Sequence, residues 1–286
     1  MMIRFIKNLV KKAIRLFRKR PSNNMFWTGR EEKCPNFGDL IGPYLFEKIT
    51  GNSPIFASTS NLSLNSVYMS AGSLMSWCRE NSVIWGSGIV QRGQRFPKPQ
   101  AVYAVRGPIT RDHFIDQGYY CPEVYGDPAL LMPIFYSPEN IVRKYNIGIV
   151  PHYVDKKISR KYIKSSKLLT FIDVFDPIEE VVNQILSCNF IFSSSLHGII
   201  ISHAYNIPAV WCKFSDKLWG DDVKFHDYFS SLGMKTPKPK KIDDIFTFID
   251  LERMCAEAIT PDPITLKNIQ NELLRKCPFI VSKSDH

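Results

Sequence analysis

Short apolar runs alternate with helical segments along most of the chain. The apolar runs lie at 26–27, 67–70, 83–85 and 101–105, and then at 147–150, 168–172, 190–192 and 209–211. Between and after them, helices are predicted at about 39–49, 108–117, 177–187, 196–205, 222–232 and 262–275. This alternation is typical of β/α units around mostly parallel sheets, so the predicted fold class is α/β.

A Pro-marked stretch from 127 to 138 separates two such series. We therefore predict two Rossmann-like domains, at 25–138 and 139–286, that face each other across a cleft. Ligands of open α/β folds bind at the carboxyl ends of the strands, so the site is expected in that cleft. The last helices complete the second domain, and one of them is a candidate to cross back to the first.

The first 20 residues have a different pattern. Eight of them are basic and none is acidic, while Ile3, Ile6, Val10, Ile14 and Phe17 recur at helical spacing. This predicts a basic amphipathic helix that lies on an anionic membrane surface, since no apolar run approaches the length needed to span it. An ordinary helix packed on the enzyme or on a partner subunit is the alternative. With no secretory signal pattern, we expect a cytoplasmic protein, peripheral at the inner face of the membrane.

Composition narrows the class of protein further. The chain has 286 residues, of which 44% are hydrophobic, so it can bury a sizeable core. Its formal net charge of +10 is concentrated in the first 20 residues, and a nearly neutral body argues against a nucleic-acid partner. The seven cysteines are scattered and show no metal-ligand spacing, so we expect reduced thiols and no metal site.

The stretch 193–198, Ser-Ser-Ser-Leu-His-Gly, lies where a predicted buried strand meets an apolar helix. Hydroxyls at such a junction cap the helix, and its free N–H groups can bind an anion such as phosphate. His197 would face the same anion, and the ordinary pKa of histidine suits an acid or a base. The alternative is a capping Ser run with a histidine that only packs.

Two further motifs follow strands of the first series. Arg106 ends a strand before a Gly-Pro helix start, so its guanidinium is expected at the carboxyl edge of the sheet, where it could grip a carboxylate or phosphate. Asn36 and Asp39 flank Gly38 at the start of a helix, and Asp39 either caps that helix or faces the cleft. Gly126-Asp127-Pro128 is either a turn or part of the site. The Gly-bearing turns at 71–73 and 86–88 do not form a dinucleotide-binding fingerprint.

Taken in order, these motifs resemble the polysaccharide pyruvyltransferase family, whose members act in exopolysaccharide, capsule and cell-wall polymer synthesis. The resemblance covers residues 34–215 and rests on Asn36-x-Gly38-Asp39, Val105-Arg106-Gly107-Pro108, Gly126-Asp127-Pro128-Ala129 and Ser194-Ser195-Leu196-His197-Gly198. Leu196 and His197 match the last two residues of the family's Arg-Leu-His triplet, and Ser195 stands at its Arg position.

The resemblance implies a fold similar to GT-B glycosyltransferases, phosphoenolpyruvate as donor substrate, no cofactor or metal, and a sugar acceptor that is often lipid-linked. The product would be a pyruvate ketal on two sugar hydroxyls. Expected roles are catalytic for His197 and Asp39, and acceptor binding for Asn36 and Asp127. Expected phosphoenolpyruvate-binding residues are Arg106, Ser194, Ser195, Leu196 and Gly198, with a lysine from elsewhere as another source of positive charge.

Two other functions stay open at this point. A glycosyltransferase of the same fold would need an acidic residue for the ribose of a nucleotide sugar, and Glu179 or Glu180 follows a strand suitably. A non-catalytic scaffold in polysaccharide assembly is the second.

Overall fold

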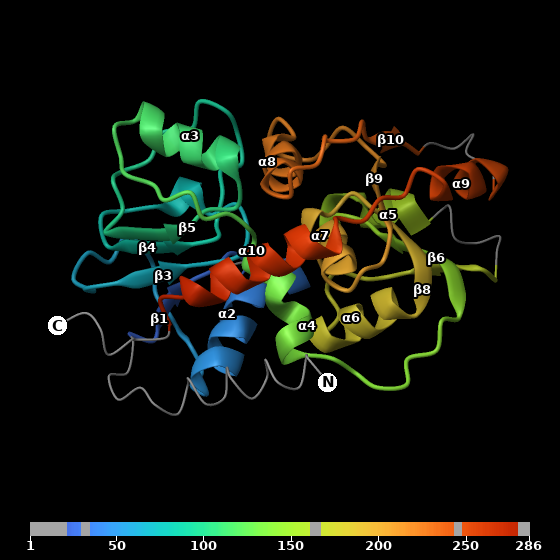
Figure 1. Ribbon diagram of the computed structural model, residues 1–286, viewed down its shortest axis with the longest axis horizontal. Coiled ribbons are helices and arrows are strands. Elements are labelled where there is room, and N and C mark those ends of the chain that lie inside the picture. The colour runs from blue at the N-terminus through green and yellow to red at the C-terminus, as the bar shows by residue number, and fades with distance from the viewer. Residues whose placement is uncertain (1–21, 30–34, 161–166, 243–247, 280–286) are drawn as a thin grey trace.

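The computed structural model describes residues 22–29, 35–160, 167–242 and 248–279. The helix predicted at 1–20 lies outside these residues. Within them, the chain forms two parallel sheets, each with its own set of helices (Figure 1). The predicted α/β class is confirmed. None of the helices in the described ranges is long and apolar enough to cross a membrane.

The first sheet has the strand order β2-β1-β3-β4-β5, and all its pairings are parallel. Its strands are β1 (Asn24–Phe26), β2 (Ile55–Phe56), β3 (Val67–Met69), β4 (Ser82–Trp85) and β5 (Ala101–Ala104). The helical segments of this half are α2 (Phe37–Thr50), η1 (Met75–Trp77), α3 (Pro108–Asp116), η2 (Pro128–Leu131) and α4 (Met132–Phe135). Every residue of β3 and β4 is buried, as expected for strands covered on both faces.

The second sheet is also parallel and has the order β10-β9-β8-β6-β7. Its strands are β6 (Tyr145–Val150), β7 (Leu169–Phe171), β8 (Cys188–Ser193), β9 (Ala209–Lys213) and β10 (Lys240–Lys241). Its helical segments are η3 (Tyr153–Asp155), α5 (Lys156–Ser159), α6 (Ile178–Leu186), α7 (Leu196–Ala204), α8 (Val223–Ser231), α9 (Phe248–Cys255) and α10 (Pro263–Arg275).

Both sheets reverse their direction of growth next to their first strand. In the first sheet β2 lies on one side of β1 and β3 lies on the other. In the second sheet β7 and β8 flank β6 in the same way. At such a switch point the loops after two neighbouring strands diverge and leave a crevice at the carboxyl edge of the sheet. The topology therefore provides two crevices, after β1 and β3 and after β6 and β8.

Two helices from late in the chain pack on the first half. The Trp85 indole donates a hydrogen bond of 3.1 Å to the carbonyl of Leu273 in α10, and Gln270 of α10 donates one of 2.8 Å to the carbonyl of Leu130. Figure 1 shows α10, in red, running across the middle of the molecule. The prediction that a C-terminal helix crosses back is confirmed, and the largest apolar cluster draws residues from both halves.

The second crossing helix is α8, which packs against α3. Fully buried Asp227 accepts hydrogen bonds from Arg106 Nε at 3.0 Å and from both the amide and the hydroxyl of Thr110, at 2.9 and 2.7 Å. Three donors compensate the cost of burying this carboxylate, and they fix the position of α8 beside the first sheet.

Candidate active site

A pocket of about 610 Å³ lies at the carboxyl ends of both sheets. Its lining comes from the loops at both switch points: residues 27–29 after β1 and 71–74 after β3, and residues 152–154 after β6 and 195–197 after β8. Further walls come from α2, from the segment after β7 and from the β9–α8 region. The pocket is thus built by the two crevices that the strand orders create.

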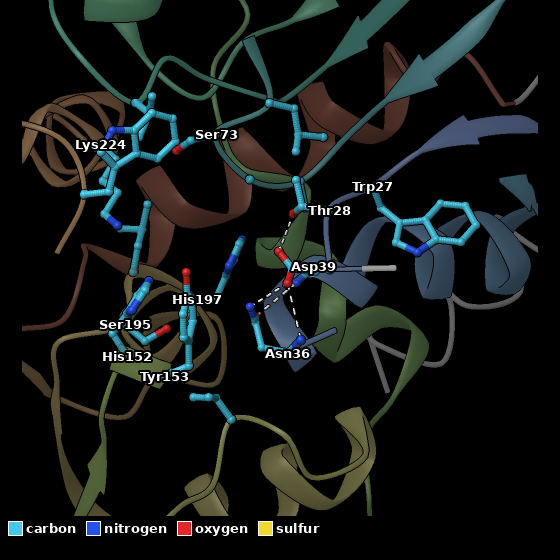
Figure 2. Close-up of a pocket in the computed structure, with 18 of the residues that line it drawn as sticks. Trp27, Thr28, Asn36, Asp39, Ser73, His152, Tyr153, Ser195, His197 and Lys224 are labelled. Carbon is cyan, nitrogen blue, oxygen red and sulfur yellow. Dashed lines mark hydrogen bonds between the residues drawn. The ribbon is translucent and has the colours of Figure 1, made fainter. Parts of the chain in front are cut away.

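Ser193 shapes the turn between β8 and α7. Its hydroxyl lies 2.7 Å from the carbonyl of Val150 and 2.8 Å from that of Ser195, and it accepts a hydrogen bond of 3.0 Å from the Ser195 amide. A Cβ at Gly198 would lie only 2.4 Å from this hydroxyl, so glycine is needed there for packing. These contacts direct the first turn of α7, which carries His197, toward the pocket (Figure 2).

The imidazole of His197 lies between two glycines from the first half. A Cβ on Gly38 would come within 2.3 Å of Nδ1, and one on Gly72 would come within 3.8 Å of Cε1. Gly72 also has a φ of +102°, which disfavours any other residue. Position 38 is glycine because the ring needs this space, whereas position 72 is glycine because of its backbone conformation. His197, which belongs to the second half, therefore packs against the first half of the molecule.

Asp127 lies behind His197 rather than on the pocket wall. Its side chain is fully buried, and its Oδ2 is 3.6 Å from His197 Nε2, which is itself buried. Oδ1 accepts from the Ala129 amide at 2.9 Å and Oδ2 from the Gly72 amide at 3.2 Å. Burial acts to raise the pKa of Asp127, but His197 and these amides outweigh it, so the pKa is lowered and the carboxylate stays charged.

The pair of Asp127 and His197 has the arrangement of a carboxylate that orients an imidazole and stabilises its protonated form. At 3.6 Å the two groups are slightly too far apart for a hydrogen bond, and such contacts often tighten when substrate binds. The expectation that Asp127 touches an acceptor is therefore corrected. Its side chain lies beside His197 instead.

Asn36 and Asp39 form a capping box at the start of α2. The Asn36 side chain accepts from the amides of Gly38 and Asp39, and Asp39 Oδ2 accepts from the Asn36 amide and side chain at 3.3 and 2.5 Å. Asp39 Oδ1 also accepts from the Thr28 hydroxyl at 2.5 Å. Both residues line the pocket, so capping and exposure to the cleft, the two interpretations open from the sequence, hold together.

Arg106 does not reach the pocket. Its guanidinium is fully buried in the ion pair with Asp227, and it also donates to the carbonyl of Ile89 and, at 2.6 Å, to the hydroxyl of Ser73. Gly88 makes room for it, since a Cβ there would lie 2.5 Å from Cζ. The sequence interpretation of an Arg106 side chain emerging at the sheet edge is corrected. The residue holds Ser73, which does line the pocket.

Ser194 is likewise turned away from the pocket. It is fully buried, accepts from the His152 amide at 2.9 Å and donates to Asp155 Oδ2 at 2.8 Å. It therefore ties the loop after β6 to the loop after β8. Of the expected anion-binding stretch, Ser195, Leu196 and His197 line the pocket, whereas Ser194 and Gly198 support them from behind.

Several lining residues were not found from the sequence. They include the basic residues His152, Lys217 and Lys224, all from the second half. Burial, followed by the charges of Lys224 and His197, lowers the pKa of His152 to about 3, so this imidazole is neutral at pH 7. His152 follows β6 as His197 follows β8, and the same sequence argument could have identified it. Lys224 lies on α8, and no local pattern reveals that α8 reaches the pocket.

Four aromatic residues form another part of the lining, here called the aromatic wall: Phe26, Trp27, Phe56 and Trp77. Trp27 meets Phe56 edge to face with ring centroids 5.0 Å apart, and Phe26 lies 5.7 Å from Trp77. Figure 2 shows Trp27 across the pocket from Lys224, with His197 between them. We call the Lys224 side of the pocket the basic side and the Trp27 side the aromatic side; the second half also contributes the rings of Tyr153, Phe175 and Trp219 to the lining.

Glu179, a candidate ribose ligand in the glycosyltransferase alternative, is engaged elsewhere. It accepts from the Tyr44 hydroxyl at 2.7 Å and pairs with Lys48 at 3.2 Å, which joins α6 to α2. Neither Glu179 nor Glu180 is among the residues that line the pocket.

The fold and the pocket define an α/β protein with a candidate active site at the carboxyl ends of two parallel sheets. A family model described as polysaccharide pyruvyl transferase matches residues 76–216. Protein L143 of Acanthamoeba polyphaga mimivirus, itself uncharacterized, is 31% identical over 265 residues, 88% of this chain and 90% of that protein. The succinoglycan biosynthesis protein ExoV of Rhizobium meliloti (strain 1021) is 25% identical over 219 residues, 74% of this chain and 66% of that protein.

The chain belongs to the polysaccharide pyruvyl transferase family. Membership supports transfer of a pyruvyl group onto a polysaccharide.

Proposed function

We propose that the protein transfers the enolpyruvyl part of phosphoenolpyruvate onto two hydroxyls of one sugar and so forms a pyruvate ketal. The observation that carries this proposal is the placement of His197. An imidazole backed by a buried carboxylate stands between a basic side and an aromatic side of one pocket. That arrangement suits a reaction that needs an acid between a small anionic donor and a sugar acceptor.

The chemistry requires one proton transfer to carbon. His197 would donate its proton to C3 of phosphoenolpyruvate while a sugar hydroxyl attacks C2, giving a methyl group and a carbon that bears the ether, the phosphate and the carboxylate. The proton lost by that hydroxyl returns to the imidazole. A second hydroxyl of the same sugar then displaces phosphate at C2 and its proton leaves with the phosphate, so atoms and charge balance. Asp127 would stabilise the imidazolium form before donation.

The donor end would lie on the basic side. Ser195, the first amides of α7 and the pocket lysines can meet the negative charge of phosphate and carboxylate. Ser73, held by Arg106, adds a hydroxyl to this side.

The acceptor would occupy the other side. Aromatic faces pack against the apolar faces of sugar rings, and Asn36 and Asp39 beside them supply hydrogen-bonding groups. Three hydrogen bonds fix the Asp39 carboxylate at the wall, where we propose that it orients the attacking hydroxyl. We further propose a lipid-linked oligosaccharide as the natural acceptor, met at the inner face of the membrane through residues 1–20.

The test incubates the full chain with phosphoenolpyruvate and a panel of methyl hexosides that present different hydroxyl pairs. We expect acceptor-dependent phosphate release together with an acceptor product that carries one ketal pyruvate by NMR. His197→Ala should lower turnover by about 10²-fold or more while the protein stays folded. A folded His197→Ala enzyme with normal turnover would refute the proposed acid, and product formation from a nucleotide sugar instead would refute the donor.

A further inference from the structure

Lys224 is a cation of the pocket lining that has no carboxylate partner within 4 Å among the described residues. It lies in the first turn of α8, the helix that the Arg106–Asp227 ion pair holds against the first half. The nearby carboxylates are already engaged: Asp227 binds Arg106 and Thr110, and Asp222 binds Lys213.

The surroundings of Lys224 are otherwise positive. Burial, the largest cause, and then the charge of Arg106 lower its pKa to about 8, and only the charge of Asp222 opposes them. Its charge in turn contributes to the lowered pKa of His152. An ammonium with a pKa of about 8 is still mostly protonated at pH 7, so the free protein holds a poorly compensated positive charge at this side of the pocket.

A neutral sugar hydroxyl cannot neutralise the positive charge of Lys224, whereas a doubly charged phosphate can. Lysine is a common phosphate ligand because its compact charge approaches the oxygens from several directions. Lys224, His152 and Ser195 lie on the same side of His197 in Figure 2, across from Trp27. A phosphate bound by Lys224 would therefore stand beside His197 and away from the aromatic wall.

We propose that Lys224 binds the phosphate of the donor and neutralises the charge that develops on it as it leaves. This inference rests on the proposed function, and it names the residue that sets which side of the pocket takes the donor. Since the contact strengthens as phosphate departs, Lys224 contributes to turnover as well as to affinity.

The experiment measures binding of phosphoenolpyruvate and of inorganic phosphate by calorimetry. Lys224→Met should weaken both at least about tenfold, equivalent to 1.4 kcal/mol, and Lys224→Arg should restore most of the affinity. Lys235→Met is the matched control, since it removes the same charge from an exposed position just after α8 that does not line the pocket, and it should bind as the wild type does. If Lys224→Met proves unstable, Lys224→Gln serves in its place.

The outcomes separate this inference from the proposed function. Wild-type affinity for phosphoenolpyruvate in a folded Lys224→Met protein overturns the role of Lys224 and leaves the donor intact. If the wild type binds inorganic phosphate through Lys224 but does not bind phosphoenolpyruvate, the phosphate site stands and the proposed donor fails. Loss of phosphate binding in the Lys235→Met control would show a general charge effect and overturn the assignment.

Discussion

Substitution of Gly38 by alanine should disable the enzyme without unfolding it. Gly38 lies in the first turn of α2, and the added Cβ would stand 2.3 Å from His197 Nδ1 and 2.9 Å from its Cγ. Ordinary van der Waals contact begins at 3.4 Å, so the imidazole would have to move by about 1.1 Å. The buried Asp127 on its other side limits where the ring can go.

The expected effects on activity and on stability differ in size. A displacement of about 1 Å at a reacting group can cost about 100-fold in rate, or about 2.7 kcal/mol of transition-state stabilisation. Alanine is a better helix former than glycine by up to about 1 kcal/mol, which offsets part of the strain, so the loss of folding stability should be small. A large fall in kcat with little change in melting temperature is therefore predicted.

The assay is phosphate release from phosphoenolpyruvate under saturating acceptor, with thermal unfolding measured on the same preparations. Gly42→Ala is the control, because it lies in the same helix and its Cβ would come close only to the end of the Met25 side chain, with Cε at 3.1 Å, while Ser70 Cβ at 3.4 Å and Ala71 N at 3.8 Å are ordinary contacts. Gly42→Ala should keep its turnover. If Gly38→Ala is folded and turns over at the wild-type rate, the close contact between α2 and His197 has no catalytic importance.

Three further predictions follow from the described geometry and from the sequence. Asp127→Asn should lower kcat at least about tenfold, because protonated His197 loses its carboxylate; an unchanged kcat in the folded variant would contradict this. Burial lowers the pKa of His203 to about 4, so its contribution to stability is complete above about pH 6.5 and is lost as pH falls toward 4, by up to about 3 kcal/mol. Urea unfolding at several pH values should show this loss of unfolding free energy in the wild type, and His203→Gln should reduce its dependence on pH. The same pH dependence in both proteins would refute the role of His203. Deletion of residues 1–20 should abolish binding to vesicles that contain anionic lipid and spare turnover of a short soluble acceptor, whereas unchanged vesicle binding would exclude the membrane helix.

Local patterns were sufficient for the main β/α elements. The predicted run at 147–150 and helix at 196–205 correspond to β6 and α7, because buried strands and apolar helices have distinct lengths and boundaries. The two-residue strands β2 and β10 were missed, since a two-residue strand is too short to show any periodicity. Five of the six described cysteines are buried free thiols.

The site was predicted less completely, and the reason is tertiary packing. The sequence left open whether His197 and Asp39 face the cleft, and the structure brings both, with Asn36, into one pocket. Each follows or begins an element at the carboxyl edge of a sheet. The sequence did not indicate that α8 would cross to the first half. That crossing brings Asp227 to Arg106 and removes the guanidinium from the pocket, while it places Lys224 in the lining.

The identity of the donor is tested most directly by the melting temperature of the purified chain with phosphoenolpyruvate and, separately, with a panel of nucleotide sugars. A ligand that binds only the native state stabilises it by about 2.7 kcal/mol at a concentration of 100 times Kd, or several degrees for a chain of this size. We predict that phosphoenolpyruvate raises the melting temperature and that Lys224→Met removes most of the rise. A rise with a nucleotide sugar and none with phosphoenolpyruvate would contradict the proposed donor.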